Sequence, residues 1–293
     1  MKKRMLRADV LLEVVCYIFL VILTLFILIP LLNLFSVSIS SQESVIAGRV
    51  RLIPQDIQLE AYRMVLLSGS FYRSLLNTAL VTLGGTLIGC LSTVAAAYAL
   101  SRPRLPGRKI ITFLFLLTMI FNGGMIPSYL LINKLGLLNS LWAVLLPTSV
   151  SAYNLLIVKS YMESLPEAID DAARIDGATR LQTLVHVIIP TSLPVIATVG
   201  IFYAVTLWND YLNSYLYLTK QTMFTLQLYL KSVIFDASDP MGGFSVGEDV
   251  TKRLAPQTII NATIITSILP IACVYPMLQK YFINGIMLGA VKE

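Results

Sequence analysis

The chain alternates long apolar runs with shorter polar or charged connections, and this alternation dominates its pattern. A helix needs about 20 predominantly apolar residues to cross the hydrocarbon layer of a membrane. Runs close to that length are expected as spans at residues 14–34, 75–100, 110–127, 141–158, 191–210 and 258–278. The pattern therefore predicts an all-α membrane protein, with about six transmembrane helices in one domain over residues 1–293.

The charges in the connections predict which side of the membrane each one occupies. The short loop at residues 102–109 carries four positive charges and no acid, and Lys and Arg also precede the first run. Short loops rich in Lys and Arg lie on the cytoplasmic side. We therefore expect both termini and residues 163–190 in the cytoplasm. The outer loops are then residues 36–74, with a short helix near 59–67, and residues 212–256.

The first apolar run is expected to stay as a span. It is longer than the apolar core of a secretory signal peptide, which has about 7–15 residues, and no small-residue cleavage site follows it. Pro30 within this run predicts either a kink or the outer end of the helix.

Glycines interrupt two of the runs. Gly84, Gly85 and Gly89 place small side chains in the second run, where they would let neighbouring helices approach closely in lipid. The sequence 122–124, Asn-Gly-Gly, followed by Pro127, predicts a break in the third run.

Composition agrees with a membrane protein and excludes several classes of function. Of the 293 residues, 56% are hydrophobic and 13% are charged, whereas soluble domains carry about 25% charged residues. The net charge of +6 comes without a basic helix or an aromatic–basic platform, so nucleic acid is not an expected partner. The three cysteines lie in apolar stretches without metal-ligand spacing and are expected to act as small buried hydrophobes.

One charged stretch, residues 163–190, differs from the rest of the chain. Pro166 lies where the first turn of a helix tolerates proline, and acids follow near the positive end of the helix dipole. Asp176-Gly177 is a helix-stop signal, because glycine readily takes the left-handed conformation. A second helix is expected from Thr179 to Pro190.

Two faces of this stretch have a recognisable pattern. Ala168, Ala172 and Ile175 fall on one side of the first helix, a narrow stripe of small residues that suits docking into a groove of another protein. A solvated loop with helical propensity is the alternative interpretation. One side of the second helix is expected to carry Leu181, Leu184, Val185 and Ile188.

The same residues resemble a known family. Asp171-Ala172-Ala173, three residues, Gly177, nine residues and then the sequence Val-x-Ile-Pro ending at Pro190 resemble the EAA loop of permeases in binding-protein-dependent ABC importers. The chain has Asp171 where the family has Glu, and Val187 and Ile189 replace Ile and Leu. The surrounding P-E-A-I-D-D-A-A-R-I-D-G-A is similar to the carbohydrate branch, which includes maltose permeases.

The resemblance implies the type I ABC importer permease (MetI-like) architecture, with a coupling helix in the cleft of a cytoplasmic ATPase. The residues it implies for ATPase coupling are Glu167, Asp170, Asp171, Ala172, Ala173, Arg174, Asp176, Gly177 and Pro190. The implied partners are a second, homologous permease, two cytoplasmic ATPase subunits, a periplasmic or extracellular solute-binding protein, an oligosaccharide and membrane lipid. The implied location is the bacterial cytoplasmic (inner) membrane.

The chain lacks the G-x-x-x-x-G-K-[ST] sequence that binds nucleotide phosphates. ATP and Mg are therefore expected in the partner ATPase subunits, and no cofactor or metal is expected in this chain.

Further segments bear on the substrate and on contacts with partners. F-N-G-G-M-I-P and Q-K-Y-F-I-N-G-I-M-L-G-A resemble a subgroup that handles complex or acidic oligosaccharides, in which this chain is similar to the smaller permease of an alginate importer. The resemblance also implies that the outer loop at 212–256, with residues 241–247 as its mobile tip, contacts the binding protein. It further implies that residues 287–293 reach towards the ATPase pair.

A polar group lies at the end of the fifth run. Ionisable residues at membrane depth cost about 2.5–3.5 kcal/mol on insertion scales and usually serve a cavity or pathway. Residues with this expected role in the substrate pathway are Trp208, Asn209, Asp210 and Asn261. The alternatives are an interfacial cap at a helix end for Asp210 and a hydrogen bond to a neighbouring helix for Asn261.

Other classes of function fit the sequence less well. A stand-alone secondary transporter commonly has paired repeats and ionisable residues inside its spans, and neither is evident here. Residues 243–247 match the G-x-S-x-G sequence of hydrolases, but the only histidine, His186, is predicted on the opposite side of the membrane. A calcium loop near Asp236 fails because Met241 occupies the position that needs glycine.

Overall fold

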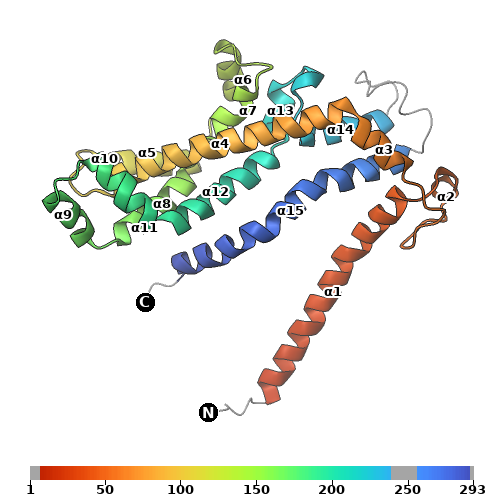
Figure 1. Cartoon of the computed structure of the whole chain (residues 1–293), viewed down its shortest axis with the longest axis horizontal. Coiled ribbons are helices and arrows are strands. Elements are labelled where there is room, and N and C mark those ends of the chain that lie inside the picture. The colour runs from red at the N-terminus through yellow and green to blue at the C-terminus, as the bar shows by residue number, and fades with distance from the viewer. Residues whose placement is uncertain (1–6, 239–255, 291–293) are drawn as a thin grey trace. The chain divides into compact units, whose positions relative to one another are not determined.

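The computed structural model describes residues 7–238 and 256–290 (Figure 1). Every regular element within these ranges is a helix, as predicted. The chain forms two compact units, Met1–Ser68 with Leu230–Pro270 and Gly69–Tyr229 with Ile271–Glu293. The single transmembrane domain expected from the sequence stays a prediction.

The first unit contains α1 (Arg7–Ser38), α2 (Gln42–Ile46) and α3 (Glu60–Leu67), and two helices run across its boundary, α14 (Leu226–Ser238) and α15 (Pro256–Ala290). The second unit contains α4 (Gly69–Ser101), α5 (Arg108–Ile120), α6 (Met125–Lys134), α7 (Leu141–Thr148), α8 (Ala152–Ser164), α9 (Glu167–Ile175), α10 (Arg180–Thr183), the π-helix η1 (Leu184–Ile188), α11 (Ile189–Thr191), α12 (Leu193–Trp208), α13 (Leu212–Tyr217) and the 3₁₀-helix η2 (Gln221–Met223).

Helix α1 is a long, uniformly apolar element. Its segment Leu11–Ser38 has 28 residues, which gives a length of about 42 Å at 1.5 Å per residue, enough to cross a membrane. Its large apolar side chains are exposed on every side of the helix, as lipid contact requires. Pro30 lies inside α1, and the helix continues beyond it to Ser38.

The connection after α1 folds back on the end of that helix. Asn33 Nδ2 donates to the carbonyl of Arg51 at 2.6 Å, and Ser36 Oγ donates to the carbonyl of Leu52 at 2.6 Å. These bonds occupy backbone carbonyls that a loop would otherwise leave to water. Helix α3 follows at Glu60–Leu67, where the sequence predicted a short helix.

In the second unit, α4 is the central helix. It packs against α7, α8 and α12, and it runs beside α12 in Figure 1. A Cβ atom on Gly85 would lie 2.6 Å from Leu207 Cδ1, and one on Gly89 would lie 3.0 Å from the Tyr203 ring. The close approach predicted for glycines of this run is therefore confirmed at Gly85 and Gly89, whereas Gly84 has open space around it.

A buried hydroxyl connects three helices of this unit. Tyr203 of α12 lies within hydrogen-bond distance of Thr93 Oγ1 of α4, at 2.8 Å, and it accepts from the backbone N–H of Ser151 at 3.0 Å. Ser151 is the N-cap of α8, next to the bend between α7 and α8. The hydroxyl therefore stabilises this bend from inside the packed helices.

Several expected spans are broken helices. Among the described residues, three helices are long and apolar enough to cross a membrane, or up to six spans exist if each bent pair counts as one. The pairs are α5 with α6, bent by 113°, α7 with α8, bent by 45°, and α10–α11 with α12, bent by 81°. The break predicted at 122–124 lies between α5 and α6, whereas the sequence analysis missed the bend at 149–151.

The connection expected at 212–256 contains helices that the sequence analysis did not predict. Helices α13, η2 and α14 lie within it, and the part of α14 from Leu226 to Phe235 is apolar. The proposed contact segment 241–247 lies outside the described residues, as does the end of the C-terminal tail at 291–293.

Candidate coupling site

The charged segment 163–190 begins where α8 ends. After Ser164 the backbone extends at Leu165, and α9 begins directly after Pro166. Proline restricts the residue before it to extended conformations, which separates the two helices at this point. Helix α9 is therefore a short independent helix of nine residues at one end of the second unit (Figure 1).

Helix α9 has one face on the protein and one face in the open. Ile169 packs against the core cluster that contains Met162 and Ile188, and Ala173 is buried. Ala168 and Ala172 are exposed, and Ile175 has 85% of its surface exposed. The stripe of Ala168, Ala172 and Ile175 predicted for one face is thus an exposed apolar surface, which we call the docking face.

A glycine elbow ends α9. Gly177 has φ +77°, the left-handed conformation, and the N–H of Ala178 donates to the carbonyl of Ala173 at 2.9 Å. This six-residue closure is the Schellman type of helix end. The helix stop predicted at Asp176-Gly177 is confirmed, since α9 ends at Ile175.

The second helix of the segment starts with a reciprocal cap. The N–H of Thr179 donates to Gln182 Oε1 at 2.8 Å, and the N–H of Gln182 donates to Thr179 Oγ1 at 3.3 Å. The sequence analysis placed the start of this helix correctly but missed the cap, which the spacing Thr-x-x-Gln indicates.

The second helix does not have the single apolar face that was predicted. A π turn occupies Leu184–Ile188, so the side chains after it are rotated relative to a continuous α-helix. Ile188 is buried in the core, but Leu181 and Val185 are exposed. Pro190 follows this turn and lies in the first turn of α11, where its missing N–H is tolerated.

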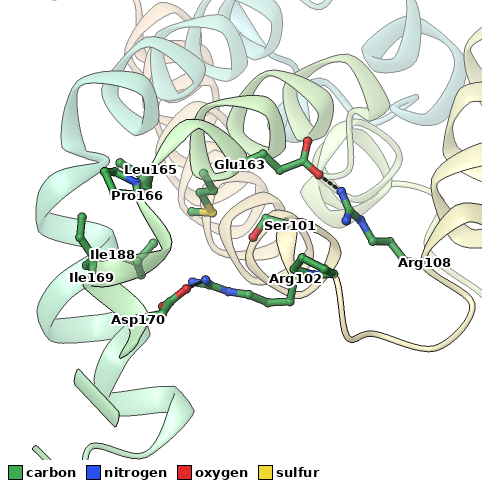
Figure 2. A pocket seen from close by; sticks show the side chains of 11 residues that line it. Ser101, Arg102, Arg108, Glu163, Leu165, Pro166, Ile169, Asp170 and Ile188 are labelled. Atoms are coloured by element: carbon green, nitrogen blue, oxygen red, sulfur yellow. Dashed lines mark ion pairs between the residues drawn. The ribbon is translucent and has the colours of Figure 1, made fainter. Parts of the chain in front are cut away.

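Two ion pairs connect the segment to the loop between α4 and α5. Arg102 pairs with Asp170 of α9, and Arg108 at the start of α5 pairs with Glu163 near the end of α8 (Figure 2). Lys159 Nζ also contacts Glu163 Oε1 at 2.9 Å. The four residues of the two pairs line a cavity of about 390 Å³ beneath α9. The sequence analysis did not predict these contacts.

Aromatic residues reinforce both ends of the segment. The Arg102 guanidinium lies 4.4 Å from the centroid of the Tyr98 ring, and Tyr98 Oη donates to the carbonyl of Arg180 at 3.3 Å. Tyr161 Oη donates to the carbonyl of Thr191 at 2.9 Å. Residues at the end of α4 therefore contact both α9, through Asp170, and α10, through Arg180.

The residues predicted to couple to the ATPase differ in how exposed they are. Asp171, Ala172, Asp176, Gly177 and Pro190 are exposed, whereas Ala173 is buried. Asp170 is turned towards Arg102 rather than left free (Figure 2). Glu167 and Arg174 belong to α9, but their side chains lie outside the described part of the chain.

The predicted pathway residues at the end of α12 have local structural partners. Asp210 accepts from the N–H of Ser214 at 3.1 Å and from Asn213 Nδ2 at 2.6 Å, and thereby holds the start of α13. Asn209 Nδ2 donates to the carbonyl of Val205 at 2.9 Å. Trp208 ends α12 and is half-buried, and the half-buried Asn261 belongs to α15 in the first unit.

His186 lies on the exposed side of the π turn. Its Nδ1 is 3.2 Å from the carbonyl oxygen of Gln182, one turn earlier. In the described ranges, no group of His, Cys, Asp and Glu side chains is arranged to hold a metal ion.

A comparison with known protein families finds a match over nearly the whole chain. A family model described as "Binding-protein-dependent transport system inner membrane component" matches residues 2–287. The polygalacturonan/rhamnogalacturonan transport system permease protein YtcP of Bacillus subtilis (strain 168) is 37% identical over 282 residues, which cover 96% of this chain and 98% of YtcP. The arabinooligosaccharides transport system permease protein AraQ of Halalkalibacterium halodurans is 28% identical over 271 residues, 90% of either chain.

A solved structure is similar over nearly the full length. It is a crystal structure of a bacterial ABC transporter involved in the import of the acidic polysaccharide alginate. The matching chain has a TM-score of 0.87 and 37% identity, and the alignment covers 95% of this chain and 99% of that one.

Proposed function

Because this chain belongs to the family of binding-protein-dependent transport system inner membrane components, and is a sugar or oligosaccharide permease of the ABC type, we propose that α9 is its coupling helix. In this proposal the chain forms half of a pore with a second, homologous permease. Two cytoplasmic ATPase subunits bind ATP and Mg and act on α9. The residues 163–190 then lie in the cytoplasm, together with both termini.

The observation that carries the proposal is the docking face. Ala168, Ala172 and Ile175 are apolar and exposed. By contrast, Ile169 packs against the core of the unit and Ala173 is buried. A small-residue surface of this kind fits a groove closely, since alanine side chains hold the partner near the helix backbone. The alternative of a solvated loop does not explain an isoleucine left in the open beside two alanines.

The contacts behind the docking face indicate how motion passes into the membrane. Displacement of α9 moves Asp170 and its partner Arg102, and Arg102 lies at the end of α4. Helix α4 packs along α12 and α8, so a pull on α9 reaches these helices together. The ATPase supplies free energy through this contact only to the extent that it binds one arrangement of the helices better than the other.

We also propose the location and the other partners. The permease lies in the cytoplasmic (inner) membrane of a bacterium, and a periplasmic or extracellular solute-binding protein delivers the sugar. The family description, which names dependence on a binding protein, supports this arrangement. Trp208, Asn209, Asp210 and Asn261 remain the proposed lining of the pathway.

For the substrate, we propose an acidic oligosaccharide of the alginate type. The support is the similarity to a transporter that imports the acidic polysaccharide alginate and the 37% identity to a polygalacturonan/rhamnogalacturonan permease. ATP-driven uptake of labelled alginate and galacturonan oligosaccharides into proteoliposomes would test this part separately from the coupling role.

Replacing Ile175 by Asp tests the docking face. Burial of an isoleucine contributes about 1.5–3 kcal/mol, so the variant should bind the ATPase subunit at least about tenfold more weakly. Co-purification of the ATPase with the tagged permease measures this loss. Sugar-dependent ATP hydrolysis in proteoliposomes should fall in parallel.

Ile53→Asp is the matched control. Ile53 is 77% exposed, close to the exposure of Ile175, but it belongs to the connection after α1. This variant should keep the ATPase bound. Equal co-purification of the ATPase with Ile175→Asp and with the unchanged chain would contradict the coupling role of α9, and uptake driven by an ion gradient without ATP would contradict the ABC mechanism.

A further inference from the structure

A second cavity shares Pro103 and Arg108 with the cavity beneath α9. It has a volume of about 740 Å³ and is lined at one end by Arg108, Lys109 and Lys159. Apolar side chains of α5 also line it, and three of these are exposed: Ile110, Phe113 and Leu116. The cavity therefore combines a cationic end with an apolar groove along one helix.

The cationic end carries more positive charge than its own partner neutralises. Glu163 pairs with both Arg108 and Lys159, so two cations share one carboxylate, and Lys109 forms no ion pair among the described residues. The Lys159 side chain is only 12% exposed, and it has to share its carboxylate with Arg108. In the described part of the chain, the three basic side chains of the cavity therefore outnumber their one paired carboxylate by two.

The start of α5 adds to the excess of positive charge. Gly107 is its N-cap, without a capping side chain, and the first turn has no acid but begins with Arg108 and Lys109. The N-terminus of a helix is its positive end, where anions are stabilising and basic residues are not. Thr112, one turn later, lines the cavity, and its Oγ1 has no hydrogen-bond partner in the described chain. The site is thus deficient in acceptors as well as in negative charge.

The position of the site fixes the kind of anion that reaches it. The loop joins α4 to α5, and both helices belong to candidate membrane spans, so its cations lie at a membrane surface. The apolar side chains beyond them follow α5 into the lipid. An amphiphile with a negative head and acyl chains satisfies both parts of the lining, whereas free phosphate leaves the apolar part in contact with water.

We propose that this cavity is a binding site for an anionic membrane phospholipid, with its phosphate at Arg108, Lys109 and Lys159 and an acyl chain along Phe113 and Leu116. Clusters of basic residues at membrane surfaces attract anionic headgroups by about fivefold in affinity for each Lys or Arg. The proposal depends on the membrane location of the chain and not on the coupling role of α9.

The test uses the full permease, co-expressed with the subunits that purify with it and transferred to detergent. Native mass spectrometry counts bound lipid after titration with phosphatidylglycerol or phosphatidylcholine of equal chain length. The unchanged protein should bind phosphatidylglycerol at least tenfold more tightly. Lys109→Gln should weaken that binding about fivefold, and Arg108→Gln with Lys109→Gln about 25-fold.

Two further variants control for charge and for folding. Lys134→Gln removes an exposed lysine from the last turn of α6 and should leave phosphatidylglycerol binding within twofold of the unchanged protein. Lys109→Arg keeps the charge and should bind as well as the unchanged protein. Loss with Lys109→Gln but not with Lys109→Arg then identifies the charge as the cause.

Four results would overturn the proposal. The first is equal affinity for phosphatidylglycerol and phosphatidylcholine, and the second is an equal loss with Lys134→Gln. The third is displacement of bound phosphatidylglycerol by millimolar inorganic phosphate, which would make the cavity a plain anion site. A crosslink from Phe113 to another importer subunit would also overturn it, because that subunit would then occupy the groove.

Discussion

Gly177 shows how one residue determines the shape of the segment 163–190. Its φ of +77° is readily accessible only to glycine, yet a Cβ atom at this position would meet nothing within 4 Å. The requirement is therefore one of backbone conformation and not of space. An alanine would fit sterically but would cost about 1–2 kcal/mol in the left-handed conformation.

We predict that Gly177→Ala lowers sugar uptake per ATP hydrolysed, because the elbow no longer holds α9 at one angle to the second helix. Gly177→Asn should retain more coupling, since asparagine tolerates the left-handed conformation better. Uptake and hydrolysis measured on the same proteoliposomes give the ratio.

Gly136→Ala provides the matched control for this prediction. Gly136 has φ +69° and equally open surroundings, but it lies between α6 and α7. It should lower thermal stability to a similar degree without changing the ratio of uptake to hydrolysis. Equal ratios for the two variants would mean that Gly177 acts on stability alone.

Asp210 has two candidate roles at the same position. Its carboxylate holds the start of α13 through Asn213 and Ser214, which agrees with the interpretation as a helix cap. A cap and a pathway residue differ in what they need: a cap needs an acceptor oxygen, whereas a charged pathway lining needs the negative charge.

Asp210→Asn separates the two roles, because asparagine keeps one acceptor oxygen for the N–H of Ser214. If Asp210 lines the pathway, uptake should fall about tenfold or more, the size of effect expected for about 1.4 kcal/mol, at unchanged expression and thermal stability. If this variant takes up sugar at the wild-type rate, capping of α13 is the only role left for Asp210.

At the scale of elements, α9 is a helix with two different attachments. On its inner face Ile169 packs against the core and Ala173 is buried, and one ion pair attaches the helix to the end of α4. Arg102 and Asp170 have side chains that are 30% and 25% exposed, so water and salt weaken their attraction. The pair therefore serves to orient α9 more than to stabilise the protein.

Exchanging the two charges tests this orientation. Arg102→Asp and Asp170→Arg should each lower the ratio of uptake to hydrolysis, because each places like charges together. The double variant should recover part of it, with a coupling energy of about 0.5–1 kcal/mol in thermal unfolding at low salt.

Arg104→Asp is the control for the exchange, since Arg104 is exposed in the same loop and forms no ion pair among the described residues. Independent, additive effects of the two single changes would refute a direct interaction between Arg102 and Asp170 in the working transporter.

At the scale of the whole molecule, the long apolar runs predicted those helices correctly whose length alone identifies them as membrane spans. Helices α1, α4 and α15 contain the expected spans, because a run of more than 18 apolar residues has few alternatives to a membrane helix. The break after Ile120 was also predictable, since Asn-Gly-Gly disfavours a continuing helix.

Other features depend on contacts that a local pattern does not contain. The bend at 149–151 is stabilised by Tyr203 from another helix, and the segment has no glycine to indicate it. Helix α14 was missed because its short run, rich in apolar and aromatic residues, is compatible with either helix or strand. The pairing of Arg102 with Asp170 joins residues far apart in the chain and follows from packing alone.

The Tyr203 hydroxyl has a consequence for any movement that straightens the bend between α7 and α8. Straightening α7 and α8 would withdraw the half-buried Ser151 amide from it, and the net loss of one such hydrogen bond costs about 0.5–1.5 kcal/mol. Any partly straightened geometry incurs this loss before replacement partners form. The bend therefore has no smooth range of angles, and passage through this point should occur as a thermally activated jump between separate conformers.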